Sequence, residues 1–211
     1  MNYSETIFSK TFILFLFTIQ IIYAQELITP IPQKSDYNKP KALLGKKLFF
    51  DPRLSADNTI SCATCHDVYN GGDDKLEVSF GVNGKKGSRN SPTVLNVKYN
   101  TIQFWDGRSK DLFEQIEGPI HNPVEMASNF PQIINKINKD PLYKKEFSAL
   151  YKQGITKTTI IDAIVEFQNA LITPNSKFDQ YLNGDNNALN KNELNGYLLF
   201  KEYGCISCHN G

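Results

Sequence analysis

The four cysteines of this 211-residue chain all lie in two copies of one five-residue pattern. The copies are Cys62-Ala-Thr-Cys65-His66 and Cys205-Ile-Ser-Cys208-His209, and they also use two of the three histidines. Cys-x-x-Cys-His is the attachment pattern of c-type haem. Two thiols three positions apart on one helical turn can reach the two vinyl groups of a haem, and the adjacent imidazole can then ligate the iron.

Three other uses of the cysteines explain the pattern less well. A zinc site with four cysteine ligands would use both Cys-x-x-Cys pairs but gives no reason for a histidine after each. A thioredoxin-like redox pair would need a single motif in a βαβ setting, which is absent. Disulfide pairing also ignores the histidines. We therefore predict two covalently bound haem c groups, attached at Cys62, Cys65, Cys205 and Cys208, with His66 and His209 as iron ligands.

A similar segment precedes each motif, which suggests a duplication. Gly45-Lys-Lys-Leu48-Phe49 stands before the first motif, and Gly196-Tyr-Leu-Leu199-Phe200 before the second. The second segment is predicted to be a helix with Asn190 as its cap, Glu193 at position N3 and an apolar face of Leu194, Tyr197, Leu198 and Leu199. Two helix-then-haem units favour cytochrome c-like domains in a mostly α-helical fold with long loops.

Between the motifs the sequence predicts loops and short helices. Glycines at positions 71, 72, 81, 84 and 87 interrupt regular structure, as suits a long loop wrapped around a haem. The clearest amphipathic helix is predicted over Thr158 to Leu171, with inward positions Ile160, Ile161, Ile164, Val165, Phe167 and Leu171. A polar, turn-rich segment follows at 183–187. We expect a first haem domain over residues 25–184 and a second domain that starts at residue 185.

Composition and charge exclude several classes of protein. The chain has 23 Lys+Arg against 22 Asp+Glu, so charge alone would not hold nucleic acid. A hydrophobic fraction of 40% with 21% charged residues is typical of a folded chain rather than a disordered one. Beyond the N-terminus no apolar run approaches the length of a membrane span.

The N-terminus has the features of an export signal. Lys10 precedes a mainly apolar run from Thr11 to Ile22, and Ala24 offers a small residue for cleavage. A basic start, a short apolar core and a small residue at the cut are typical of a secretory signal peptide. We expect residues 1–24 to be removed and the mature protein to be periplasmic.

The region between the motifs carries a further series of short patterns. They are Gly87-Ser-Arg89-Asn90-Ser-Pro-Thr93-Val-Leu-Asn96, then Gln103-Phe-Trp105-Asp106-Gly107-Arg108, then Gln115, and then Gly118-Pro-Ile-His-Asn-Pro-Val-Glu125-Met126. In this order, between two haem motifs, the series closely resembles the bacterial dihaem cytochrome c peroxidases and their MauG-type relatives. The resemblance runs from about Leu43 to Gly211.

The resemblance implies that the first haem is the peroxidatic site and that the second relays electrons. Glu125 would be the acid/base that moves a proton from the near oxygen of bound peroxide to the leaving one. Gln115 would complete the distal pocket, and Trp105 would help electrons cross between the haems. Asn90 would be a calcium ligand at the domain interface. Without the resemblance, each residue has an ordinary structural interpretation. Glu125 and Gln115 would be solvated surface residues, Trp105 would pack in the core, and Asn90 would shape a turn.

One departure from the family concerns the distal side of the first haem. Many members carry a distal histidine at the position that aligns with Val82, and valine cannot ligate iron. We therefore expect the first haem to be open and to react without reductive activation. His121, four residues before Glu125, is either a distal-pocket group, a replacement ligand or a loop histidine near the mouth of the pocket, and we favour the last.

A second departure concerns the end of the chain. The distal ligand of a cytochrome c domain, often methionine, comes well after the motif, but the only methionines here are Met1 and Met126. Residues 188–211 are too few to enclose a haem, since domains below about 40 residues rarely fold unaided. We therefore interpret the chain as a fragment whose second domain is incomplete. The alternative is a natural short form, in which the second haem would be badly exposed.

Four functions are compatible with the sequence. The first is a cytochrome-c peroxidase, an oxidoreductase that reduces hydrogen peroxide to water with electrons from a small cytochrome c or cupredoxin. The second is a MauG-type oxidase of a protein or organic substrate, and the third is a plain electron-transfer cytochrome c. A haem-free zinc-binding module is the least favoured. The family further implies a homodimer.

Overall fold

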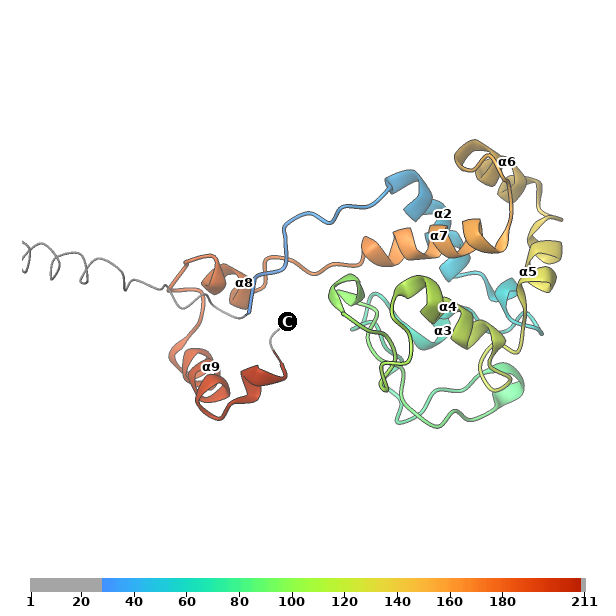
Figure 1. The fold of residues 1–211 in the computed structure, drawn as a ribbon. Coiled ribbons are helices and arrows are strands. Elements are labelled where there is room, and N and C mark those ends of the chain that lie inside the picture. The colour runs from blue at the N-terminus through green and yellow to red at the C-terminus, as the bar shows by residue number, and fades with distance from the viewer. Residues whose placement is uncertain (1–27, 210–211) are drawn as a thin grey trace, which may run out of the picture. The chain divides into compact units, whose positions relative to one another are not determined.

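The computed structural model describes residues 28–209, so the predicted signal peptide, 1–24, lies outside the described residues. This range contains eight α-helices and no β-strand, only two isolated bridges. The helices are α2 (Lys39–Phe49), α3 (Cys62–Cys65), α4 (Leu112–His121), α5 (Phe130–Ile137), α6 (Pro141–Leu150), α7 (Lys157–Asn169), α8 (Lys177–Leu182) and α9 (Lys191–Glu202), as Figure 1 shows. The predicted mostly α-helical fold is confirmed. None of the described helices has the length and apolar character that crossing a membrane requires.

The chain divides into two compact units. Residues 30–191 form the larger unit, and residues 192–209 belong to the smaller one. The larger unit contains the first Cys-x-x-Cys-His motif, and the smaller contains the second.

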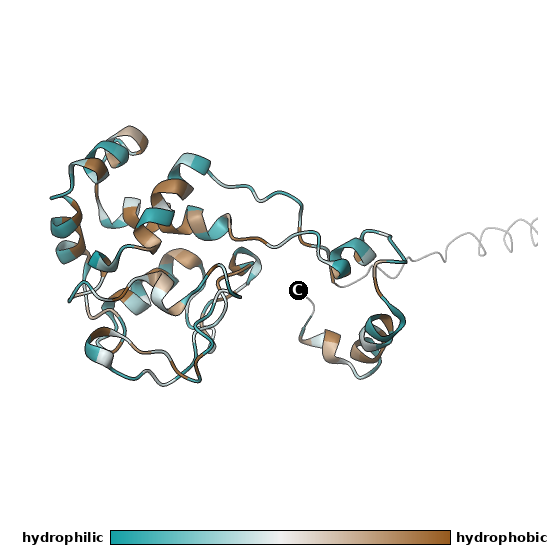
Figure 2. Ribbon diagram, turned by 180° about the vertical axis from the view of Figure 1, so that it is seen from behind, coloured by the Kyte–Doolittle hydropathy of each residue, from teal (hydrophilic) through white to brown (hydrophobic). Residues whose placement is uncertain are grey.

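Helices α2 and α7 form the centre of the larger unit and lie side by side in Figure 1. Gly45 of α2 allows this close approach, because a Cβ at that position would overlap the carbonyl oxygen of Ala163. The Lys41 ammonium also donates to the Asp162 carboxylate of α7 at 2.8 Å. Around the helices of this unit the ribbon alternates between apolar brown and polar teal (Figure 2).

Helix α7 begins and ends close to the predicted limits. Thr156 and Thr159 form a capping box at its start, which satisfies backbone N–H groups that have no partner within the helix. The predicted inward face is confirmed for the residues inside the helix, all of which are buried: Ile160, Ile161, Ile164, Val165 and Phe167. Leu171 lies beyond the last helical residue and is partly buried against the same core.

The segment from His66 to Asp111 is the predicted long loop. It contains no α-helix, only the 3-10 turns Val82–Gly84 and Val97–Tyr99. Gly71 and Gly72 adopt φ values of 93° and 80°, in the left-handed region that glycine enters without steric cost. The loop prediction is therefore confirmed.

The smaller unit contains the predicted helix, but part of the face that was predicted to be buried is exposed. Tyr197 of α9 is buried as expected, whereas Leu198 and Leu199 are 50% and 37% exposed. Among the described residues 192–209, the structure contains this helix and the 3-10 turn Cys205–Ser207, and no second helix that covers those leucines. The expected apolar face is thus only partly buried.

Gly45 of α2 and Gly196 of α9 stand at equivalent positions, but substitution by alanine should change the stability of the protein differently at each. Gly45→Ala should destabilise the protein by about 1–3 kcal/mol or more, because the methyl group meets a backbone carbonyl in a packed core. Gly196 has nothing within 4 Å of an added Cβ, so Gly196→Ala should be neutral or stabilise α9 by up to about 1 kcal/mol. Urea unfolding followed by circular dichroism measures both changes. A Gly45→Ala protein as stable as wild type would contradict the described α2–α7 packing.

Candidate functional site

The first Cys-x-x-Cys-His motif forms the single-turn helix α3. Ser61 caps it, and its N–H donates to the Thr64 hydroxyl at 3.0 Å. Cys62 and Cys65 are free thiols, both half-buried, and their spacing of three residues places them on one side of the turn. Burial raises the pKa of Cys62 to about 12 and also raises the pKa of Cys65. Both groups are therefore neutral thiols at ordinary pH.

His66 is held by the turn that follows it. The Asp67 carbonyl accepts the N–H groups of Asn70 and Gly72, which closes the turn. The Gly72 carbonyl then lies 3.2 Å from His66 Nδ1. Since a carbonyl can only accept, Nδ1 carries the proton and Nε2 keeps its lone pair. Burial also lowers the pKa of His66, which favours the neutral imidazole that binds iron.

These observations fit a c-type haem at the first motif. Two thiols on one side of a turn and an imidazole oriented through Nδ1 are the donors that such a group requires. The second motif shares part of this arrangement. The ring of Phe49 lies 6.5 Å from that of His66, and the ring of Phe200 lies 6.3 Å from that of His209. The same packing at both motifs supports the predicted duplication.

Glu125 is a half-buried acidic residue that a neighbouring side chain orients. Its charge contributes to the raised pKa of Cys65 in the first motif, after burial and the charge of Asp74. Asn122 donates its side-chain N–H to Glu125 Oε1 at 2.5 Å. Burial raises the pKa of Glu125, and the Asn122 hydrogen bond and the charge of Arg108 partly oppose that rise. The site thus holds an oriented carboxyl group whose proton affinity exceeds that of an ordinary glutamate.

Backbone hydrogen bonds from two distant loops fix the position of Glu125. The Val82 N–H donates to the Glu125 carbonyl at 2.8 Å, and the Ala56 N–H donates to the Met126 carbonyl at 2.9 Å. A Cβ at Gly81 would overlap the Val124 carbonyl oxygen, so glycine permits this contact. Val82 is 1% exposed and lies directly against the segment that carries Glu125.

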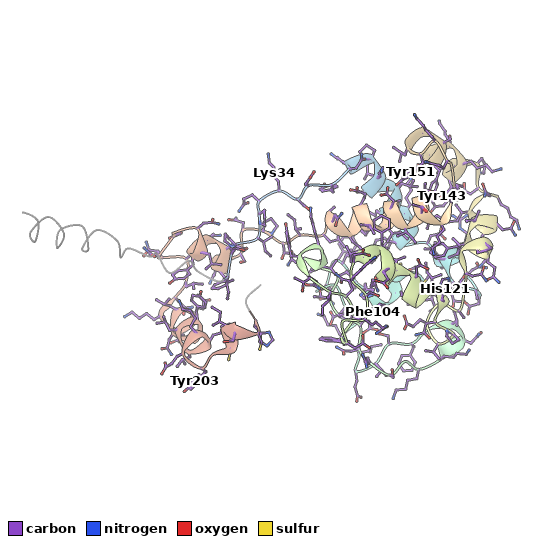
Figure 3. All side chains as sticks on the ribbon, viewed as in Figure 1. Lys34, Phe104, His121, Tyr143, Tyr151 and Tyr203 are labelled. Atoms are coloured by element: carbon purple, nitrogen blue, oxygen red, sulfur yellow. The ribbon has the colours of Figure 1, made fainter. Side chains whose placement is uncertain are left out.

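Helix α4 places Gln115 on the same face as Asn122. The Asp111 carboxylate caps this helix through the Glu114 N–H at 2.8 Å, and positions 115, 118 and 122 share one face. Phe104 packs against Gly118 on that face (Figure 3), 2.6 Å from where its Cβ would lie. The Arg108 guanidinium lies 3.4 Å above the centre of the Phe104 ring. Gln115 itself is half-buried.

Sequence reasoning singled out Glu125 but missed the residues that orient it. Asn122 stands three residues before Glu125, a spacing at which an Asn side chain commonly bonds within its own turn. This spacing is the sequence feature from which the Asn122–Glu125 hydrogen bond could have been predicted. Nothing local indicates Gly81, whose close approach to Val124 joins distant segments, or Arg108, whose charge partly opposes the rise that burial causes in the pKa of Glu125.

Trp105 and Asn90 meet at the surface of the larger unit. The Trp105 ring is 61% exposed, and its Nε1–H donates to the Asn90 carbonyl at 3.1 Å. Trp105 is therefore not a core-packing residue, the ordinary role that its residue type suggests. The Asn90 side chain is exposed, and among residues 28–209 no three His, Cys, Asp or Glu side chains gather as ligands of a metal ion.

His121 differs from the expected loop histidine. It is the last residue of α4, it is exposed, and its ring meets Phe130 edge-on at 5.7 Å between ring centres (Figure 3). His121 and Asn122 leave the helix in different directions because successive residues are about 100° apart. The Asn122 side chain, not His121, contacts Glu125.

The sequence matches a family model described as di-haem cytochrome c peroxidase over residues 39–187. The chain is 49% identical to a cytochrome c peroxidase of Escherichia coli (strain K12), over 90% of this chain and 41% of that protein. It is 47% identical to a cytochrome c551 peroxidase of Nitrosomonas europaea, over 90% of this chain and 58% of that protein.

One solved structure is also similar in fold. It is a MauG-like protein associated with microbial copper homeostasis, with a TM-score of 0.77 and 29% identity, over 89% of this chain and 57% of that one. The chain spans between 41% and 58% of the length of the curated relatives named above.

Proposed function

The chain belongs to the di-haem cytochrome c peroxidase family, and on this premise we propose that its larger unit reduces hydrogen peroxide to water. Electrons would come from a small redox protein, either a cytochrome c or a cupredoxin. Curated relatives at 44–49% identity carry the name cytochrome c or cytochrome c551 peroxidase. A periplasmic location fits the signal peptide predicted at residues 1–24.

The observation that carries this proposal is the half-buried, oriented Glu125, whose charge acts on Cys65 of the first motif. Cys62 and Cys65 would hold a haem covalently, and that group would supply redox chemistry toward peroxide. His66 would ligate its iron through Nε2, since the Gly72 carbonyl keeps the imidazole in the required tautomer.

Proton transfer is the part of the reaction assigned to Glu125. Asn122 engages Oε1 and leaves Oε2 to take the proton from the near oxygen of peroxide and deliver it to the leaving oxygen. The raised pKa of Glu125 makes it a better base for this step than an exposed glutamate. Gln115, on the Asn122 face of α4, would add a hydrogen bond in the same pocket.

The remaining assignments concern electron supply and assembly. The second haem, at Cys205, Cys208 and His209, would relay electrons, and the exposed ring of Trp105 would help them cross to the first haem. Calcium at Asn90 and a homodimer stay predictions.

Peroxide consumption tests the proposed function. The haem-loaded protein, supplied with a reduced cytochrome c or cupredoxin, should oxidise two donor molecules for each hydrogen peroxide. Loss of peroxide without donor oxidation would favour the second candidate, a MauG-type oxidase, which the match to a MauG-like fold supports. In that case, screens with protein and small organic substrates would identify the molecule oxidised. A protein that leaves peroxide unchanged contradicts both.

Val82→His tests whether the Val82 loop lies over the first haem. A histidine at this buried position beside Glu125 should ligate the iron, convert the ferric spectrum from high-spin to low-spin and slow the reaction with peroxide. Asn83→His is the matched control, since Asn83 is exposed and histidine tolerates its positive φ. A low-spin spectrum in the control variant, or an unchanged spectrum in Val82→His, contradicts this placement.

A further inference from the structure

Aromatic side chains connect His66 with the surface of the larger unit. The ring of Phe49 lies 6.5 Å from that of His66, the ring of Phe50 lies 5.8 Å from Phe49, and the ring of Tyr69 lies 6.3 Å from Phe50. Exposure rises along this path, from 1% at Phe49 through 39% at Phe50 to 75% at Tyr69. The path begins at the iron ligand and ends at an oxidisable phenol in solvent.

Several contacts hold Tyr69 at the end of this path. It follows His66 by three residues, so their Cα atoms are at most about 11 Å apart. The Tyr69 N–H donates to the Asp67 carboxylate at 3.0 Å, which fixes the backbone of the turn. The Lys46 ammonium lies 5.6 Å from the centre of the ring. Tyr69 is thus exposed yet kept beside Phe50.

Two other tyrosines of this unit lack such a connection. Tyr143 of α6 and Tyr151, which directly follows that helix (Figure 3), donate their hydroxyl groups to Asp51 and Asp162, and burial raises the pKa of both phenols. Their ring contacts within the described residues run to Phe147 and not to His66. Tyr69 is therefore the better placed tyrosine to exchange electrons with the first motif.

We propose that Tyr69 is a surface oxidation site through which oxidising equivalents derived from peroxide reach small phenols in solvent. The inference rests on the proposed peroxide reduction at the first motif. Tyr69 gives one electron inward along the rings of Phe50 and Phe49 and releases its phenolic proton to solvent, which leaves a neutral phenoxyl radical. Two such events supply the two electrons and two protons that convert one hydrogen peroxide into two waters.

The external phenol closes the cycle. Its O–H hydrogen atom passes to the Tyr69 radical, which restores the Tyr69 phenol and leaves a phenoxyl radical in solution. Without an external phenol, the Tyr69 radical persists long enough to be trapped. The site would therefore show itself both as a position of self-modification and as a position of substrate oxidation.

Spin trapping tests this assignment directly. The haem-loaded protein is treated with hydrogen peroxide and 2-methyl-2-nitrosopropane without an electron donor, and tryptic peptides are then examined by mass spectrometry. The wild type should carry the nitroso adduct on Tyr69. Phe50→Leu keeps Tyr69 but removes the ring between it and Phe49, and should lower that adduct at least several-fold. Tyr69→Phe should abolish it, while Tyr99→Phe, an exposed control, should leave the Tyr69 adduct unchanged.

Peroxide consumption is measured in the same samples to separate the two proposals. If peroxide is consumed and the adduct lies elsewhere, or Phe50→Leu leaves the Tyr69 adduct unchanged, the Tyr69 assignment is wrong and the proposed peroxidase function stands. A sample that consumes no peroxide overturns both. Guaiacol should also suppress the Tyr69 adduct, and an adduct that persists in excess guaiacol would contradict the proposed substrate class.

Discussion

Glu125→Gln is expected to lower peroxide turnover by about 10²- to 10⁴-fold, the range that general acid–base catalysis contributes. Glutamine keeps the size of the side chain and its hydrogen-bonding oxygen for Asn122, so haem content and the resting spectrum should not change. What it removes is the oxygen that accepts and returns the proton. Steady-state kinetics on protein of equal haem content measures the effect.

The pH dependence of peroxide turnover is a second test of the role of Glu125. Glu125 must be ionised to accept the first proton, and burial raises its pKa. Wild-type activity should therefore fall as the pH drops through this raised pKa, at a higher pH than for an exposed glutamate, and Glu125→Gln should lose that limb. Glu77→Gln, at an exposed position with the same change of charge, should behave as wild type. Turnover in Glu125→Gln equal to wild type would remove Glu125 from the mechanism.

His66→Gly should abolish peroxide reduction while sparing the second haem. The imidazole is the only iron ligand that the first motif supplies, and the Gly72 carbonyl orients it. Without this imidazole, the first haem would lack its iron ligand from the protein, and with it the effect of that ligand on the redox potential of the iron. The haem absorption and the peroxide turnover of the variant report the two effects separately.

His121→Gln is the matched control for this variant. His121 ends α4 and packs against Phe130, so its loss should leave both the spectrum and the turnover unchanged. If His121→Gln instead converts a low-spin haem to a high-spin one, His121 is the replacement ligand that the sequence left open. Peroxide reduction that survives in His66→Gly would place the reactive haem elsewhere.

The haem motif and the principal helices could be predicted because their signals are local. The spacing of Cys62, Cys65 and His66 is dictated by one helical turn and one cofactor. The apolar period of α7 is likewise contained in about one dozen residues. Such features need no knowledge of the remaining chain.

The backbone hydrogen bonds that position Glu125 could not be predicted in this way because they join distant segments of the chain. The Val82 N–H meets the Glu125 carbonyl, and the Ala56 N–H meets the Met126 carbonyl, and any residue type other than proline could provide these groups. The exposure of Leu198 and Leu199 is also a property of packing, since their periodicity alone suggests a buried face. Glu125 itself was found only through the ordered resemblance to a family.

Stopped-flow absorption with stoichiometric hydrogen peroxide tests the central claim most directly. The protein is matured in a host that attaches haem c and is kept fully oxidised before mixing. Because Val82 cannot ligate iron and its N–H bonds to the carbonyl of the proposed acid/base Glu125, the resting haem should be high-spin and its spectrum should change within milliseconds of mixing. A low-spin resting spectrum that peroxide leaves unchanged would contradict an open, peroxide-reducing site.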